Sequence, residues 1–246
     1  MSQIVIENLL TNYQVFGDTG ETLLILPGWR RSVSEWIPVA KSLSSKYKVV
    51  LLDLPGFNGA TAMPKEVFGV FEYADFVKKF LEKLKINKCI VLGHSLGGRL
   101  GILLATQGNT VEKLILIDSS GIERKSLYVK IMHVMKLISS PIFVFLPISL
   151  KNKIKNMVGS QDYKTAGQMR KILVKIANQN LESFLPKIKI PTFIIWGDKD
   201  KTLPVSETKI FKQGIKGSKV RIVWGAGHDP HLQKTEQFIT ILKEIL

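Results

Sequence analysis

A serine flanked by glycines is the clearest candidate for chemistry, in the run GHSLG of residues 93–97. An apolar segment, residues 89–92, precedes the run with the length of a buried strand, and the residues after it carry apolar side chains at helical spacing. At such a junction Gly93 and Gly97 permit a tight turn that leaves the Ser95 hydroxyl projecting as a nucleophile. The alternative is an ordinary glycine-rich turn with an idle serine.

A serine hydroxyl needs a base to remove its proton, and the chain contains four histidines. His228 lies in the glycine-rich loop 224–230, which follows a strand-like segment, so its imidazole can reach the carboxyl edge of a sheet. His94 adjoins the serine and is expected to point away from its hydroxyl. His133 belongs to a helical segment, and His231 is expected to open the last helix. His228 is therefore the predicted base.

The base requires a carboxylate that fixes its tautomer and stabilises its cation. Asp198 and Asp200 follow the strand-like segment that ends at residue 196, and Asp118 ends the preceding one. Asp200 is preferred because it lies a few residues beyond the strand, where a loop can carry it toward the histidine. Asp198 is expected to cap or brace the turn. The chain order is then nucleophile, acid, base.

Attack on a carbonyl creates an oxyanion, which is stabilised by N–H groups aimed at the developing charge. The backbone amide of Leu96 directly follows the nucleophile and begins a helix, whose N-terminal end favours negative charge. The second donor should come from the turn at residues 27–30, which follows an apolar strand. We predict the backbone amide of Trp29 for this role.

The remaining chain alternates apolar strand-like segments with amphipathic helical ones. We expect further strands at residues 22–26, 48–52, 111–117, 191–196 and 219–223, and helices from Ser32 or Ser34 to Leu43 and at 71–84, 206–215 and 231–245. Alternation of this kind with short connections predicts an α/β fold, with a mostly parallel sheet covered by helices on both faces.

Residues 122–186 interrupt the alternation and are predicted to form a helical insertion between two parts of the core, residues 1–121 and 187–246. From 122 to 190 the chain has 13 Lys and Arg against 3 Asp and Glu, with apolar residues at helical spacing. The apolar middle of the insertion either packs onto the core or forms an apolar lining or interfacial patch. The predicted pocket-lining side chains are those of Phe143, Phe145 and Leu146.

The composition limits the classes of partner. With 246 residues and 45% hydrophobic residues, the chain can bury one sizeable core. The formal charge of +15 is typical of a lysine-rich solvated surface, since no nucleic-acid-binding module or zinc-ligand spacing accompanies it. We therefore expect no specific nucleic acid, no metal and no cofactor, and only weak association of the basic insertion with anionic membranes.

The N-terminal residues and the cysteine usage bear on the compartment. The N-terminal residues lack the basic and apolar segments of a signal peptide, and the expected location is cytoplasmic. The one cysteine, Cys89, has no partner for an internal disulfide and lies within an apolar run. We therefore expect a buried, structural thiol.

Together these motifs resemble the α/β-hydrolase superfamily, in its cap-bearing form. The resemblance covers most of the chain and rests on residues 26–29, 53–57, 93–98, 191–200 and 227–228. One departure is Pro27, which stands where the family usually has histidine before the glycine of the oxyanion loop. The resemblance implies the α/β-hydrolase fold with a helical cap inserted after the sixth strand.

The resemblance also implies hydrolysis of an ester-like small molecule through an acyl-enzyme, most simply by a carboxylesterase. Serine at the nucleophile position argues against relatives that form alkyl-enzyme esters. Hydrolases of carbon–carbon bonds and acyltransferases share the triad and stay open as alternatives. A non-enzymatic binding protein with the same fold is disfavoured, because binding alone does not require all three catalytic groups.

Overall fold

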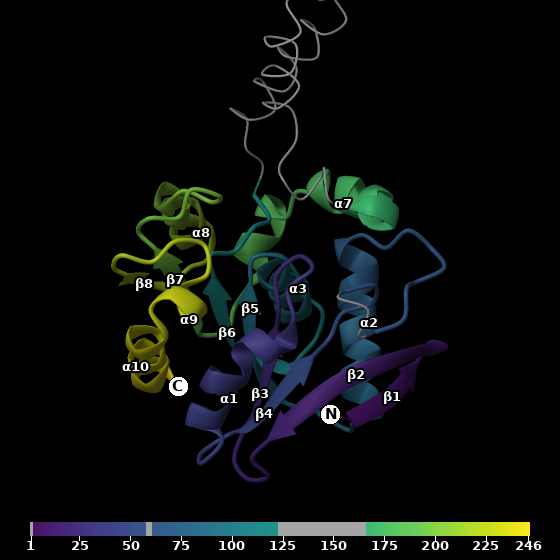
Figure 1. Cartoon of the computed structure of the whole chain (residues 1–246). Helices are drawn as coiled ribbons and strands as arrows, with labels where there is room; N and C mark the ends of the chain where they lie inside the picture. The colour runs from purple at the N-terminus through teal and green to yellow at the C-terminus, as the bar shows by residue number, and fades with distance from the viewer. Residues whose placement is uncertain (1, 58–60, 123–165) are drawn as a thin grey trace, which may run out of the picture.

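The computed structural model describes residues 2–57, 61–122 and 166–246 (Figure 1). In this part of the chain, eight strands form a single sheet in the order β1-β2-β4-β3-β5-β6-β7-β8. The six strands from β3 to β8 are parallel, as predicted, and β1 and β2 form an antiparallel edge. The strands are β1 (Ser2–Ile6), β2 (Leu9–Phe16), β3 (Thr22–Leu26), β4 (Lys48–Leu52), β5 (Cys89–His94), β6 (Val111–Ile117), β7 (Thr192–Gly197) and β8 (Lys219–Val223).

The central strands are mostly apolar, and both faces of the sheet are covered. In β3, Leu24 and Leu26 pack into one hydrophobic layer, while Leu23 and Ile25 pack into the other. All four side chains are fully buried. This pattern is typical of parallel sheets with helices on both faces. Cys89 at the start of β5 is also buried, as expected.

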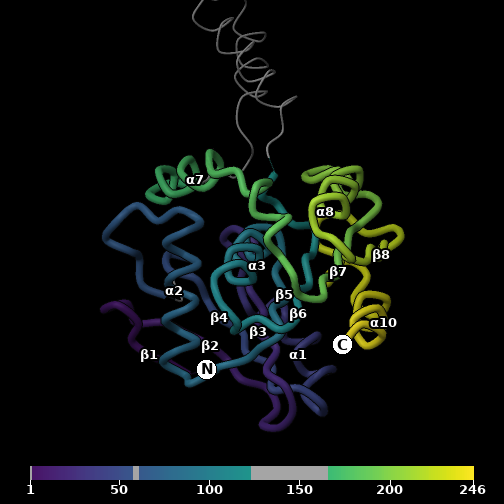
Figure 2. The backbone as a smooth tube through the Cα atoms, turned by 180° about the vertical axis from the view of Figure 1, so that it is seen from behind, coloured from purple at the N-terminus to yellow at the C-terminus, as the bar shows by residue number. Residues whose placement is uncertain are grey.

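The two helical layers have different members. The layer that contains Leu24 includes α2 (Val70–Lys83), α3 (Leu96–Thr106), the described helix α7 (Arg170–Ala177) and α8 (Thr208–Gly214). The opposite layer contains α1 (Ile37–Leu43) and α10 (Thr235–Ile245). Figure 2 shows α2 and α3 on the near side of the sheet when the molecule is viewed from behind. The prediction of helices on both faces is therefore confirmed.

The structure differs from the sequence-based expectation at the N-terminus and in the last predicted helix, and two further predicted helices begin as 3-10 segments, η1 (Val33–Trp36) and η5 (Val205–Glu207). The N-terminal hairpin of β1 and β2 was not predicted, because its half-exposed strands lack the continuous apolar runs of the central ones. The expected single helix over 231–245 is wrong. It is divided into α9 (Pro230–Gln233) and α10, since Lys234 between them adopts φ −140° and ψ 50°.

The predicted insertion is described only in part. After residue 166 the chain forms a 3-10 turn (η3, Gly167–Met169), α7 and a second 3-10 segment (η4, Glu182–Lys187) before β7. The predicted pocket residues Phe143, Phe145 and Leu146, together with His133, lie outside the described residues. Over the described ranges, no helix is both long and apolar enough to cross a lipid bilayer.

Candidate active site

Ser95 occupies a strained turn between β5 and α3. Its backbone has φ 51° and ψ −107°, a conformation that residues with side chains rarely adopt. The flanking glycines are required by close packing. A Cβ atom at Gly93 would lie 2.3 Å from the carbonyl oxygen of Gly97, and one at Gly97 would lie 2.1 Å from that of Leu26. This is the strand-turn-helix geometry expected of a nucleophile elbow.

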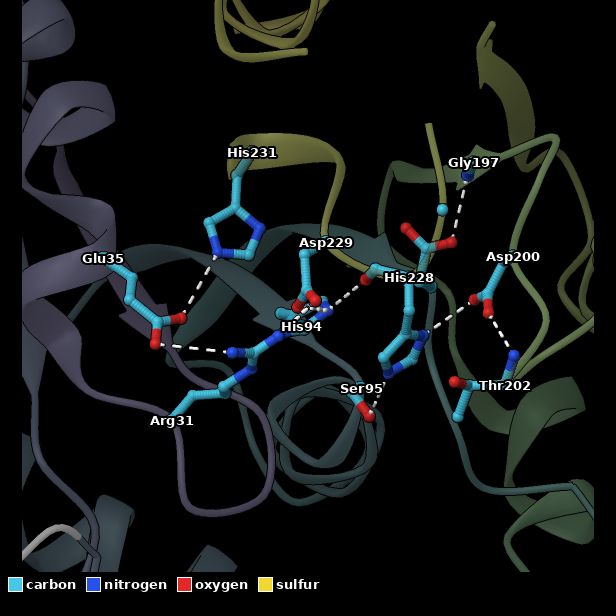
Figure 3. A network of polar contacts seen from close by, with 12 residues as sticks. Arg31, Glu35, His94, Ser95, Gly197, Asp200, Thr202, His228, Asp229 and His231 are labelled. Atoms are coloured by element: carbon cyan, nitrogen blue, oxygen red, sulfur yellow. Dashed lines mark hydrogen bonds and ion pairs between the residues drawn. The ribbon is translucent and has the colours of Figure 1, made fainter. Parts of the chain in front are cut away.

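The structure brings Ser95, His228 and Asp200 together at the carboxyl edge of the sheet (Figure 3). His228 Nε2 lies 3.1 Å from Ser95 Oγ, and His228 Nδ1 lies 2.7 Å from Asp200 Oδ2. Asp200 Oδ1 in turn accepts hydrogen bonds from the backbone amides of Thr202 and Leu203, at 2.7 and 2.8 Å. A continuous hydrogen-bonded chain thus runs from the serine hydroxyl to a fixed carboxylate.

The surroundings of Asp200 favour its charged form. Burial alone would raise the pKa of this carboxyl, but the hydrogen bond and charge of His228, with the amide of Leu203, hold it below its usual value. An ionised Asp200 can accept a hydrogen bond from Nδ1–H of His228. Nε2 of the same ring then carries no proton and is free to take one from Ser95. Asp198, the rejected acid, instead accepts a hydrogen bond from the backbone of Gly225 and braces the turn, as expected.

The two predicted oxyanion donors lie in segments that pack on each other. Leu96 is the first residue of α3, where backbone amides have no partner within the helix. The turn that contains Trp29 follows β3 and is tied to the start of this helix, because the amide of Gly97 donates to the carbonyl of Pro27 at 3.1 Å. The Trp29 ring packs edge-on against Phe57. Proline at position 27 thus keeps a backbone contact with the elbow.

His94 supports the loop that carries the predicted base. It is 1% exposed, and its Nε2 donates a hydrogen bond to the backbone carbonyl of His228 at 2.7 Å. Burial and the neighbouring His228 lower the pKa of His94 to about 4, so the ring is neutral at pH 7. His94 therefore faces away from the serine hydroxyl, as predicted, and joins the elbow to the His228 loop.

A second connection, which the sequence analysis missed, joins the Trp29 turn to the His228 loop. The Arg31 guanidinium donates to the carboxylate of Asp229 and lies 3.5 Å from that of Glu35. Figure 3 shows this pair beside His94. The sequence offers only one charged residue beside the Trp29 turn and another within the His228 loop, and such residues are usually solvated. The pair links the segments that carry a predicted oxyanion donor and the predicted base.

His231, in the short helix α9, is packed as an aromatic ring. It stacks on Trp36 with a centroid separation of 3.8 Å and an interplanar angle of 5°. Burial lowers the pKa of His231 to about 2, and the ring is therefore neutral. One side-chain atom each of His94, Asp229 and His231 lies within 4.8 Å of the others, and these are metal-binding residue types. Because His94 Nε2 carries a proton and Asp229 pairs with Arg31, we interpret the group as structural.

The Arg31–Asp229 pair makes a testable contribution to activity. Arg31→Gln is expected to lower kcat/KM for a reaction at Ser95 by about tenfold, or about 1.4 kcal/mol, because the two loops lose their common anchor. Asp229→Asn should have a similar effect, and the double variant should be little worse than either single one. Steady-state kinetics on the wild type, the two single variants and the double variant measures this coupling. Effects that multiply independently would contradict the role of the pair.

Comparisons with known proteins agree with this geometry. Residues 21–137 match the family profile of the alpha/beta hydrolase fold. A crystal structure of a membrane phospholipase A, described as a bacterial virulence factor, superposes with a TM-score of 0.79 at 26% identity, covering 99% of this chain and 84% of that one. The chain belongs to the α/β-hydrolase superfamily.

Other members of the superfamily extend the comparison. Monoacylglycerol lipase ABHD6 of Mus musculus is 25% identical over 252 residues, covering 92% of this chain and 75% of that protein. A meta-cleavage product hydrolase (CumD) variant is similar in fold alone, with a TM-score of 0.75 at 20% identity over 99% of this chain and 97% of that one. This α/β-hydrolase is accordingly an enzyme of the hydrolase class.

Proposed function

We propose that this α/β-hydrolase is a serine esterase that cleaves ester-like acyl substrates through Ser95, His228 and Asp200. The observation that carries the proposal is the hydrogen-bonded chain from Ser95 Oγ through His228 to Asp200. The strained backbone of Ser95, which exposes a hydroxyl above the sheet, supports the same assignment.

In the proposed first half-reaction, Ser95 Oγ attacks the ester carbonyl and its proton passes to His228 Nε2. The carbonyl oxygen becomes an oxyanion, which the backbone amides of Leu96 and Trp29 stabilise. The tetrahedral intermediate then collapses, the bond to the alcohol breaks, and Nε2 returns the proton to the leaving oxygen. Asp200 stays ionised throughout and stabilises the imidazolium.

In the second half-reaction, water replaces the alcohol. His228 Nε2 removes a proton from the water as its oxygen attacks the acyl-enzyme, and the same two amides stabilise the second oxyanion. Collapse releases the carboxylic acid, and the proton on Nε2 returns to Ser95 Oγ. The substrate ester and one water are consumed, and an alcohol and an acid are formed.

For the substrate, we propose a lipid-like ester. Two of the similar proteins are named as a monoacylglycerol lipase and a membrane phospholipase A, and the segment between β6 and β7 is basic and apolar in sequence. Such a segment suits an acyl chain with an anionic group, or action at an anionic surface.

The proposal is tested with a panel of p-nitrophenyl esters of increasing acyl length, a monoacylglycerol, a phospholipid, a matched thioester and a carbon–carbon hydrolase substrate. We expect ester turnover with a preference for medium or long acyl chains, and binding to vesicles that contain phosphatidylglycerol. A short-chain preference without vesicle binding would contradict the lipid-like substrate. Turnover of the carbon–carbon substrate alone would contradict the esterase.

A further inference from the structure

Asp118 is a second carboxyl group beside the proposed triad. It follows β6, has a side chain that is fully buried, and adopts a left-handed backbone conformation with φ 39°. One of its side-chain oxygens lies within 4.8 Å of a carboxylate oxygen of Asp200 and of a ring nitrogen of His228. The esterase mechanism described above does not use this group.

Two adjacent carboxyl groups in the protein interior do not both ionise readily, because like charges repel and burial disfavours charge. Their hydrogen bonds decide which one carries the charge. Asp200 accepts from two backbone amides and from His228 Nδ1. Asp118 accepts one hydrogen bond, from the backbone amide of Gly197 to Oδ1 at 3.0 Å. The greater number of donors places the negative charge on Asp200.

The proton of a neutral Asp118 can be assigned to one oxygen. Oδ1 is the acceptor for Gly197, whereas the buried Oδ2 accepts no hydrogen bond from a donor among the residues that the structure describes. Burial raises the pKa of Asp118 to about 10, and the charge of Asp200 adds to this effect. The titratable groups around Asp118 are Asp200, His228 and, more weakly, Asp229.

We propose that Asp118 is a neutral carboxylic acid whose Oδ2–H group donates a hydrogen bond to the Asp200 carboxylate and so positions Asp200 toward His228. The inference rests on the proposed esterase function. A carboxylate has about four acceptor sites, and Asp118 supplies a fourth donor after Thr202, Leu203 and His228. The bond also joins the end of β6 to the loop after β7. Asp118 is thus a positioning residue that acts through Asp200.

The test compares two substitutions at this position. An asparagine reproduces the neutral acid, because its carbonyl can accept from Gly197 and its amide N–H can donate to Asp200. An alanine removes both interactions. We expect Asp118→Ala to lower kcat for a p-nitrophenyl ester by at least about tenfold, and Asp118→Asn to recover most of that loss. Circular dichroism tests whether both variants are folded. Equal losses in both folded variants would contradict the donor role.

The pH profile distinguishes the donor role from a merely structural one. The acid limb of kcat/KM reports protonation of the base. If Asp118 is neutral, Asp118→Asn removes no charge, and the acid limb of the kcat/KM profile keeps its midpoint pH. If Asp118 were ionised, the same change would remove a negative charge near the base, and the limb would move to lower pH. A shift of that sign would overturn the proposal.

Infrared spectroscopy provides a measurement that does not depend on activity. The wild-type minus Asp118→Asn difference spectrum at pH 7 should contain the carbonyl band of a protonated carboxylic acid. A carboxylate band in its place would overturn the inference even if the enzyme is an active esterase. Conversely, a protonated band in a protein without esterase activity would contradict the proposed function and leave the protonation of Asp118 established.

Discussion

Replacing Ser95 with alanine is expected to lower kcat for p-nitrophenyl ester hydrolysis by about 10⁴-fold or more. The substitution removes the proposed nucleophile and leaves the proposed oxyanion donors, the amides of Leu96 and Trp29, in place. The binding of a non-hydrolysed ester analogue should therefore change little. Steady-state kinetics and calorimetric binding measure the two effects separately.

Ser45→Ala is the matched control for this change. Ser45 is exposed and lies between α1 and β4. It therefore lies at the amino end of a parallel strand, whereas Ser95 lies at the carboxyl end of one. The Ser45→Ala variant should retain wild-type kinetics. Residual activity of Ser95→Ala within tenfold of the wild type would contradict the assignment of the nucleophile, provided that circular dichroism shows a folded protein.

Asp200→Asn is expected to lower kcat by about 10² to 10⁴-fold. The amide keeps the shape of the side chain but can donate a hydrogen, so Nδ1 of His228 is no longer required to carry the proton. The charge that stabilises the imidazolium is also lost. Kinetics at saturating substrate measures the effect.

Asp198→Asn tests whether the correct carboxylate has been chosen. The two aspartates are in the same loop, but Asp198 accepts a hydrogen bond from Gly225 and not from His228. An asparagine carbonyl can keep that bond, and the loss of activity should be at least tenfold smaller than for Asp200→Asn. The opposite ranking would show that Asp198 serves the base.

The central sheet and the positions of the three proposed catalytic side chains could be predicted because they depend on local patterns. Continuous apolar runs identify buried parallel strands, and parallel strands place their carboxyl ends at one edge. The loops that contain Ser95, Asp200 and His228 each follow such a strand. Their meeting in space therefore follows from topology, without knowledge of any side-chain contact.

The supporting contacts could not be predicted, because they join residues far apart in the sequence with no distinctive spacing. Arg31 and Asp229 are ordinary charged residues until the fold places them side by side. Asp118 could be recognised as a carboxylate at a strand end, but its protonation depends on burial and on the number of hydrogen bonds that Asp200 accepts. The β1–β2 hairpin is half exposed and lacks a strong apolar pattern.

Labelling with a fluorophosphonate probe, mapped by peptide mass spectrometry, tests the central claim most directly. Such probes form a covalent bond with an activated serine, and activation is what the contacts with His228 and Asp200 are proposed to provide. We predict one modified residue, Ser95, with labelling abolished in Ser95→Ala and greatly slowed in His228→Ala. A folded wild-type protein that remains unlabelled, or that is labelled at another serine, would contradict the account.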